Sequence, residues 1–268
     1  MYRQIPFWEK GGKDGSCMEY VIGIDLGTSG TKTVLFDREG RGIASALAEY
    51  PLYQERNGWA EQDPQDWWNA ACQTLRQVTA ESGVAPEDIK GVGISGQMHG
   101  LVMLDKEGQV LRRSIIWCDQ RTAAQCEEIT QLVGKERLIQ ITANPALTGF
   151  TASKILWVRE NQPELYARSA HILLPKDYVR YMLTGEFATE VSDASGMQLL
   201  DVPHRQWSQE VLEKLGIDPA LLGKVYESPE VTGEITKEAA ALTGLKAGTP
   251  VVGGAGDNAA AAVGTGVV

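Results

Sequence analysis

Residues 21–32 read Val-Ile-Gly-Ile-Asp-Leu-Gly-Thr-Ser-Gly-Thr-Lys, and this stretch decides how the fold is interpreted. The apolar, β-branched run before Asp25 is typical of a buried strand, and a second such run follows the turn. The stretch therefore predicts a hairpin of two strands joined by a tight polar turn. A third strand is expected over 42–50, paired with the second.

The turn of this hairpin carries chemistry as well as structure. Its backbone N–H groups and hydroxyls suit phosphate oxygens, and the carboxylate of Asp25 beside it can hold a hydrated Mg²⁺. It is not a Walker-type loop, because no Gly-Lys-Ser/Thr opens a helix after it. A dinucleotide fingerprint is excluded too, because a strand follows the glycines. The competing interpretation is an ordinary glycine-rich hairpin with a structural aspartate.

Length and composition limit the class of protein. The chain has 268 residues, 43% hydrophobic and 22% charged, an ordinary globular balance that needs no disulfide or metal staple. A net charge of −10 argues against nucleic acid or an anionic membrane as the main partner. Nucleotide binding stays open, because Mg²⁺ and local N–H groups bind phosphate within an acidic protein.

The cysteines and the first residues indicate a cytoplasmic location. The chain has no CxxC pair and no zinc-type spacing, which predicts reduced thiols; its four cysteines are Cys17, Cys72, Cys118 and Cys126. Residues 1–17 lack the apolar core of a signal peptide and are expected to be a flexible extension before the domain begins near Met18. No apolar run reaches the ~20 residues of a membrane span.

The rest of the chain alternates helices and strands, which predicts a mixed sheet with flanking helices. A helix is expected between the N-cap residue Asp63 and Gly83. Further helices are expected to end near 133 and to cover 151–159, 176–183, 207–215 and 236–242. Further strands are expected over 89–95, 101–104, 114–117, 172–174 and 249–253. Residues 190–196 are interpreted as a polar connection.

The loop Gly96-Gln97-Met98-His99-Gly100 is a second candidate site. It follows a strand end, where α/β proteins bind ligands, and its glycines let the backbone approach a ligand closely. His99 offers a donor and an acceptor, which suits sugar hydroxyls. The alternative is a histidine that is merely hydrogen-bonded within the fold.

The turn Gly254-Ala255-Gly256-Asp257-Asn258 is the third candidate site. Asp257 stands where a strand meets an alanine-rich helix. With a reference pKa of ~3.9, a carboxylate there is ionised at neutral pH and can accept a proton, unless burial raises that pKa. The alternative is a simple helix N-cap.

Together the motifs at 25–32, 96–100 and 253–258 resemble those of the FGGY carbohydrate kinases. Residues 149–161, Gly-Phe-Thr-Ala-Ser-Lys-Ile-Leu-Trp-Val-Arg-Glu-Asn, are similar to a signature of that family. The resemblance runs from about 19 to 268 in the expected order. Within the family, the loop at 96–100 is most similar to that of members acting on the ketose D-xylulose.

The resemblance implies an α/β fold of the ribonuclease H-like, actin-like ATPase superfamily, with a mixed central sheet, an antiparallel hairpin meander and flanking helices. It implies ATP-dependent phosphorylation of D-xylulose to D-xylulose 5-phosphate, with ATP and Mg²⁺ as cofactors. The expected partners are the ketose sugar and ATP, without nucleic acid or membrane, and a homodimer is left open.

The resemblance also implies roles for individual residues. Asp257 matches the catalytic base, and Asp25 matches the aspartate on the metal side. Sugar contacts are implied for Met98, His99, Asn258, Trp117 and Asp119. The phosphate side of the site is implied for Gly27, Thr28, Ser29, Thr31 and Lys32. Lys154 is interpreted as structural.

The length departs from the family, whose members are about twice as long. We therefore expect 18–253 to be the N-terminal sugar-binding domain and 254–268 to open a C-terminal nucleotide-binding domain, so that this chain alone is inactive. One alternative is a kinase for ribulose, glycerol, fuculose or gluconate, and another is a non-catalytic sugar-binding module. The motifs at 98–99 and 257–258 argue against an actin-like or Hsp70-like ATPase.

Overall fold

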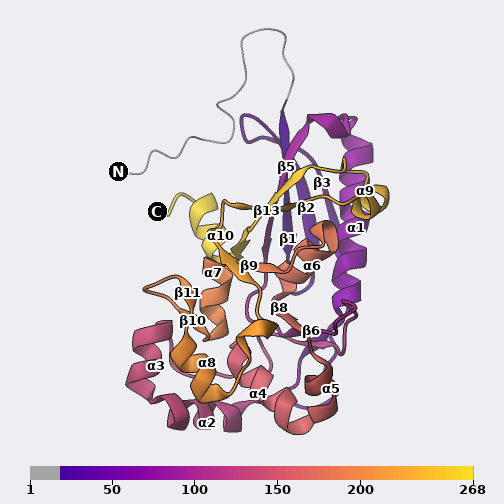
Figure 1. Ribbon diagram of the computed structural model, residues 1–268. Coiled ribbons are helices and arrows are strands. Elements are labelled where there is room, and N and C mark those ends of the chain that lie inside the picture. Colours follow the sequence, from indigo (N-terminus) through magenta and orange to yellow (C-terminus); the bar gives the residue numbers. More distant parts are fainter. Residues whose placement is uncertain (1–18, 268) are drawn as a thin grey trace.

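The computed structural model describes residues 19–267 (Figure 1), so the expected extension at 1–17, with Cys17, lies outside the described residues. Within these residues, seven strands form one mixed central sheet. Its spatial order is β13 (Val231–Glu234), β14 (Pro250–Val252), β5 (Ile89–Gly96), β1 (Tyr20–Leu26), β2 (Gly30–Asp37) and β3 (Gly42–Glu49), with β15 (Ala255–Gly256) also paired to β5. This is the mixed sheet that the sequence predicts.

The predicted hairpin and meander are confirmed. Strands β1 and β2 pair antiparallel, β2 and β3 do the same, and β5 lies parallel to β1. Alternate side chains of β1, such as Ile22 and Ile24, are buried on one face of the sheet, which the helix α1 (Pro64–Ser82) covers. The hydroxyls of Thr33 on β2 and Thr74 on α1 lie 2.7 Å apart across this contact.

Helix α1 begins and ends where its capping residues predict. The side chain of Asp63 accepts a hydrogen bond from the Gln65 N–H, and Gly83 takes the left-handed conformation at the C-cap. The remaining helices are α2 (Ala123–Val133), α3 (Lys135–Thr142), α4 (Thr151–Asn161), α5 (Pro163–Arg168), α6 (Pro175–Thr184), α7 (Val191–Ala194), α8 (Gln209–Leu215), α9 (Lys237–Thr243) and α10 (Asp257–Gly264).

Short strand pairs and 3₁₀ turns complete the described chain. The pairs are β4 (Glu61–Gln62) with β7 (Ser114–Ile115), β6 (Val102–Leu104) with β8 (His171–Leu173), β9 (Ala188–Glu190) with β12 (Lys224–Tyr226), and β10 (Leu200–Asp201) with β11 (Gln206–Trp207). The 3₁₀ turns are η1 (Pro86–Asp88), η2 (Ser195–Met197) and η3 (Pro219–Leu221). Because residues 206–207 pair as β11, the helix expected from 207 begins at Gln209.

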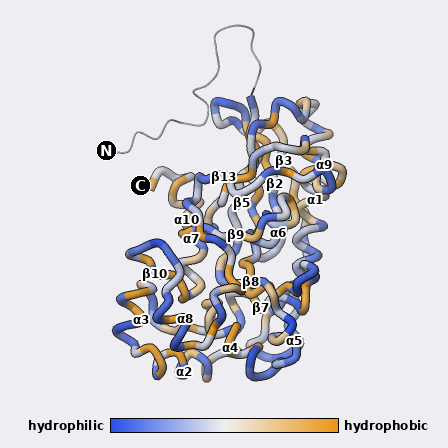
Figure 2. The backbone as a smooth tube through the Cα atoms, in the orientation of Figure 1, coloured by the Kyte–Doolittle hydropathy of each residue, from blue (hydrophilic) through white to orange (hydrophobic). Residues whose placement is uncertain are grey.

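Two apolar clusters stabilise the two halves seen in Figure 1. One lies between the central sheet and α1, with Trp67 and Leu75 fully buried, and the other joins α2, α3, α4 and α8 around Ile155 and Leu212. Figure 2 shows hydrophobic stretches in both halves. In residues 19–267, no helix is both long enough and apolar enough to span a membrane.

Several parts of the fold differ from the sequence analysis, among them helix α5 and the sheet strand β13, which were not expected. Helix α3 was not expected; it forms because Leu138 and Ile141 bury one face of a short segment. The interpretation of 190–196 as a polar connection is wrong, because the segment folds into α7 and η2. Its start is capped by Glu190, whose carboxylate accepts from the N–H groups of Ser192 and Asp193, although glutamate is not a typical capping residue.

Candidate functional site

Asp25 lies near the end of β1, on the sheet face opposite α1. Its carboxylate is exposed, and one oxygen accepts a hydrogen bond of 2.8 Å from the Ser95 hydroxyl of the neighbouring strand β5. The residue opposite it on β2 is Lys32, also exposed. Because alternate residues of a strand face opposite sides, this carboxylate and this ammonium share one open face of the sheet.

The turn between β1 and β2 is held from behind by its carbonyl groups. The carbonyl of Gly27 accepts from the Tyr50 hydroxyl and, at 3.4 Å, from the Gln97 amide. The carbonyl of Thr28 accepts from the Gln62 amide at 2.7 Å. In the part of the chain that is described, the N–H groups of Thr28 and Ser29 have no acceptor. These two N–H groups are therefore available to an acceptor, as an anion site requires.

The two remaining residues expected on the phosphate side, Thr31 and Lys32, point to opposite faces of β2. Thr31 is fully buried, and its hydroxyl lies 3.5 Å from that of Tyr50. The structure therefore does not bring the Thr31 side chain to the outer surface of the turn, because the strand alternation directs it toward α1. Lys32 is on the open face.

The loop after β5 reaches toward the start of α10. Gln97 is buried and donates to the Gln62 side chain, so Met98 and His99 are the half-exposed residues of this loop. A Cβ atom at Gly256 would lie only 2.8 Å from the Met98 thioether sulfur. This close approach places Met98 directly beside the turn that carries Asp257.

His99 is held in an unusual backbone conformation. Its φ angle is +70°, and its carbonyl accepts from the Thr151 hydroxyl at 3.1 Å and from the Lys154 ammonium at 2.8 Å. Its ring packs edge-on against Phe150, with centroids 4.7 Å apart, and Nδ1 lies 2.9 Å from the Gly196 carbonyl. Lys154 also donates to Gly149, so its role in the structure is to anchor this loop.

Burial lowers the pKa of His99 to about 4, so the ring is neutral near pH 7. In the unfolded chain a histidine has a pKa of ~6.5. Between these values the unfolded chain binds more protons, so the free energy of unfolding decreases as the pH falls from about 6.5 to 4. We expect His99→Gln to show a shallower decrease in urea denaturation across this range. Identical slopes for the two proteins would contradict the assignment.

Trp117 and Asp119 differ in how the structure uses them. Trp117 is 46% exposed, and its indole N–H donates to the Thr28 hydroxyl at 2.9 Å, which links it to the turn after β1. Asp119 is fully buried; its carboxylate accepts from the Ala60 N–H at 2.7 Å and pairs with Arg121 at 2.7 Å. The structure therefore brings Trp117 to the open site but encloses the Asp119 carboxylate.

Asp257 is the first residue of α10, one position after the N-cap residue Gly256. Its carboxylate is exposed and accepts from the N–H of Asn258 at 2.8 Å, and the Asn258 side chain is exposed beside it. The alternative interpretation of Asp257 as the N-cap is wrong, because Gly256 occupies that position. The carboxylate is thus free to face a ligand.

The sheet register brings these residues to one edge. Strand β5 pairs parallel with β1 and with β15, and Ser95 is the register partner of both Asp25 and Ala255. With strands ~4.8 Å apart, the Cα atoms of Asp25 and Ala255 are about 10 Å apart, one on each side of β5. Asp257 follows two residues later, beyond the same strand ends. The two aspartates therefore flank the loop with Met98 and His99.

A pocket of about 770 Å³ lies on the open sheet face, against α10. It is lined mostly by apolar atoms, with Asp25, Lys32 and Ser95 on the sheet side and Ala259, Ala260 and Val263 on the helix side.

The sequence analysis missed a group of buried charges behind this edge. Lys176 and Asp177 at the start of α6, with Glu190 and Asp193 around α7, are fully buried and in contact. The available signal was the short helix α6 itself, in which charged residues are interspersed with apolar and aromatic ones so that no solvated face is set apart for them.

A mixed sheet with an antiparallel meander, parallel inner strands and flanking helices is the architecture of the actin-like ATPase fold. Residues 20–264 match the model of the FGGY family of carbohydrate kinases, N-terminal domain. The chain therefore belongs to the FGGY family of carbohydrate kinases.

Individual relatives agree with this assignment. The chain is 45% identical over 251 residues to a xylulose kinase from Bacillus subtilis, a match that covers 94% of this chain and 50% of that protein. A crystal structure of xylulose kinase from Rhodospirillum rubrum is similar with a TM-score of 0.89 and 30% identity, over 93% of this chain and 51% of that one. A crystal structure of gluconate kinase from Lactobacillus acidophilus is similar with a TM-score of 0.84 and 28% identity, over 90% of this chain and 48% of that one. The chain thus spans about half the length of the relatives it matches.

Proposed function

We propose that this chain is the sugar-binding half of an ATP-dependent kinase that phosphorylates D-xylulose to D-xylulose 5-phosphate. The observation that carries the proposal is the shared strand edge, where Asp25 and Asp257 flank the loop with Met98 and His99. The xylulose kinases among the similar proteins favour the ketose. The structural likeness to a gluconate kinase supports another family substrate, such as gluconate, as the second candidate.

In this proposal Asp257 is the catalytic base. Phosphoryl transfer depends on positioning and on charge stabilisation more than on covalent chemistry. The exposed carboxylate of Asp257 accepts the proton of the attacking sugar hydroxyl, while Met98, His99, Asn258 and Trp117 orient the sugar. The buried carboxylate of Asp119 supports the site indirectly, because its ion pair holds the Arg121 side chain in place.

The N–H groups of Thr28 and Ser29 bind phosphate oxygens in the proposed reaction, with Lys32 close by. The donor set also fits Mg²⁺. Among the described residues no three His, Cys, Asp or Glu side chains gather to hold a metal, but Mg²⁺ commonly takes one or two carboxylates, with phosphates and water as its other ligands. Asp25 would hold the ion, which when bound neutralises phosphate charge.

The chain spans about half the length of its relatives, which supports a protein with separate sugar-binding and nucleotide-binding domains. We propose that residues 18–253 form the sugar-binding domain, that residues 254–268 open the nucleotide-binding domain, and that a C-terminal half supplies the adenosine pocket over the apolar pocket beside α10. The protein would act in the cytoplasm on two small molecules. Closure of two such domains would exclude water from the transfer.

The test compares this 268-residue chain with a full-length kinase that carries it as the N-terminal half. We expect the chain alone to bind D-xylulose in calorimetry without turning it over, because most of the sugar site is present and most of the ATP site is not. The full-length protein is expected to phosphorylate D-xylulose faster than ribulose, glycerol, fuculose or gluconate. A faster rate with one of those compounds would identify it as the substrate in place of D-xylulose. Turnover by the 268-residue chain alone would contradict the proposal that most of the ATP site lies in a C-terminal half.

A further inference from the structure

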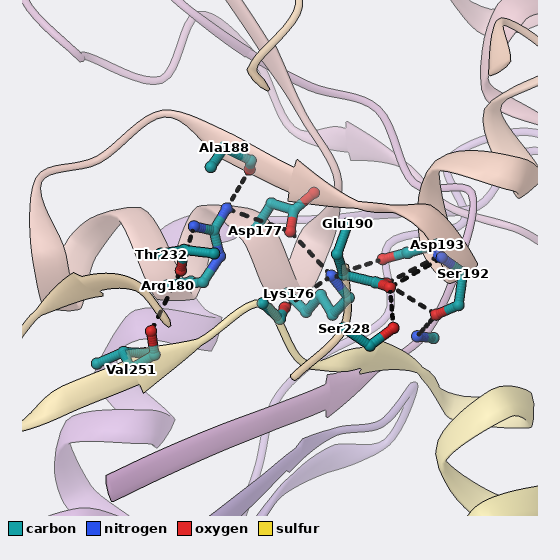
Figure 3. Close-up of polar contacts among 12 residues, drawn as sticks. Lys176, Asp177, Arg180, Ala188, Glu190, Ser192, Asp193, Ser228, Thr232 and Val251 are labelled. Atoms are coloured by element: carbon teal, nitrogen blue, oxygen red, sulfur yellow. Dashed lines mark hydrogen bonds and ion pairs between the residues drawn. The ribbon is translucent and has the colours of Figure 1, made fainter. Parts of the chain in front are cut away.

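Figure 3 shows a cluster of charged side chains around Lys176. The cluster is buried and contacts the backbone just before Asp257. Lys176 is at its centre, with Nζ 2.9 Å from the carboxylate of Asp177, 3.4 Å from that of Glu190 and 3.5 Å from that of Asp193. All four side chains are inaccessible to solvent. The cluster therefore joins the start of α6 to both ends of α7.

The charges of the cluster balance only if one carboxyl group is protonated. Arg180 also belongs to it, because its guanidinium lies 3.4 Å from Asp177; two cations thus face three carboxyl groups. Burial raises the pKa of Asp193 well above its usual range, while the surrounding carboxylates raise the pKa of Lys176. Asp193 is then the neutral member, and no net charge remains buried.

Stability alone does not explain such a cluster. Buried ion pairs can be replaced by packed apolar side chains with little loss, because desolvation offsets most of their attraction. What charged groups add is directional hydrogen bonding to defined atoms. The contacts of the cluster with the backbone ahead of Asp257 therefore matter most.

Three anchors connect the cluster to that backbone. Lys176 Nζ donates to the carbonyl of Gly253 at 3.4 Å. The hydroxyl of Ser192 donates to Glu190 at 2.8 Å and accepts from the N–H of Gly256 at 3.1 Å. The Gly256 anchor is one residue from the aspartate itself.

The third anchor passes through Ser228. Its hydroxyl donates to Glu190 at 2.7 Å, and its backbone carbonyl accepts from the N–H of Gly254 at 3.0 Å. The hydroxyl of Ser228 thus shares the carboxylate with Ser192 but has no contact with Gly256. Both serine hydroxyls donate to the Glu190 carboxylate, but it is the Ser192 hydroxyl that also accepts from the Gly256 N–H.

We propose that this cluster is the positioning element of the Asp257 turn, with Lys176, Glu190 and Ser192 as positioning residues for the base. The proposal rests on the function proposed above. The cluster holds residues 253–256 from the protein side, so that the carboxylate of Asp257 stands at the strand edge without a side-chain cap of its own. A displacement of ~1 Å at a reacting group can cost on the order of 10²-fold in rate.

The test compares Ser192→Ala with its matched control Ser228→Ala. Each variant loses one hydroxyl that donates to Glu190, but only Ser192→Ala removes the acceptor of the Gly256 N–H. We expect hydrogen exchange of the amides at 256–258 to become roughly five- to tenfold faster in Ser192→Ala, as loss of one hydrogen bond implies, and to change little in Ser228→Ala. Ser192→Thr keeps the hydroxyl and should restore slow exchange.

Kinetics of the full-length kinase supply the second measurement. Ser192→Ala is expected to lower kcat about tenfold or more while the KM for the sugar changes less than about twofold, because the base moves and the sugar contacts do not. Equal exchange rates in Ser192→Ala and Ser228→Ala would overturn the positioning role. The exchange measurement uses the 268-residue chain and no substrate, so absence of sugar phosphorylation in the wild-type kinase would refute the proposed function and leave the exchange result to decide the positioning.

Discussion

Replacing Asp257 with asparagine is expected to lower the kcat of the full-length kinase by roughly 10²–10⁴-fold, the contribution of a positioned general base. The substitution keeps an oxygen that can accept from the N–H of Asn258 but removes the charge that takes the proton. Binding of the sugar and the thermal stability of the 268-residue chain should change little, because the carboxylate is exposed and makes no ion pair in the described structure.

Asp218→Asn is the matched control for this prediction. Asp218 is also exposed, and its side chain accepts from the N–H of Ala220 at the start of η3, but it lies outside the strand edge. The kcat of Asp218→Asn is expected to match that of the wild type. A near-normal kcat for Asp257→Asn would rule out the base role, whatever the sugar.

Replacing Lys176 with methionine is expected to lower the free energy of unfolding by ~3–5 kcal/mol. The methionine has a similar length and no charge, so Asp177 and Glu190 lose the cation at the centre of the cluster and must stay charged without it or take up protons. Urea denaturation of the 268-residue chain measures the change. The expected loss of unfolding free energy is large because buried carboxylates without a cation destabilise the fold by more than their ion pairs with Lys176 stabilised it.

Two control variants separate this effect from a general sensitivity to substitution. Lys246→Met removes an exposed lysine and should change the free energy of unfolding by less than ~0.5 kcal/mol. Asp193→Asn should also cost far less than Lys176→Met, because burial raises the pKa of Asp193 and keeps it neutral. An equally large loss of unfolding free energy in Asp193→Asn would mean that Asp193 is ionised, and not protonated, in the folded protein.

Most of the sheet followed from local patterns. The apolar, β-branched runs on either side of the glycine-rich turn predict β1 and β2, and Asp63 and Gly83 mark the limits of α1. These features are local, because strand period, turn chemistry and caps are set within a few residues. Helices α3 and α7 escaped prediction because their formation depends on burial against distant segments.

Two of the residues expected at the candidate site have surroundings that local patterns could not reveal. Asp119 carries the same charge as Asp25, yet Asp119 is enclosed with Arg121 while Asp25 is open. Thr31 lies one position from Lys32 but on the buried face. In each case burial, and not residue type, decides whether a polar group can meet a ligand.

The sequence by itself determined the hairpin, its polar turn, and most of the longer strands and helices that follow. It also determined which acidic and histidine residues stand at the strand ends. Tertiary structure decided which of them meet: the parallel pairing of β1 and β15 with β5 puts Asp25 and Asp257, 232 positions apart in the printed numbering, at one edge. It also decided the charge cluster behind that edge, because the stabilisation of buried ions depends on partners that only the folded chain brings within hydrogen-bonding distance.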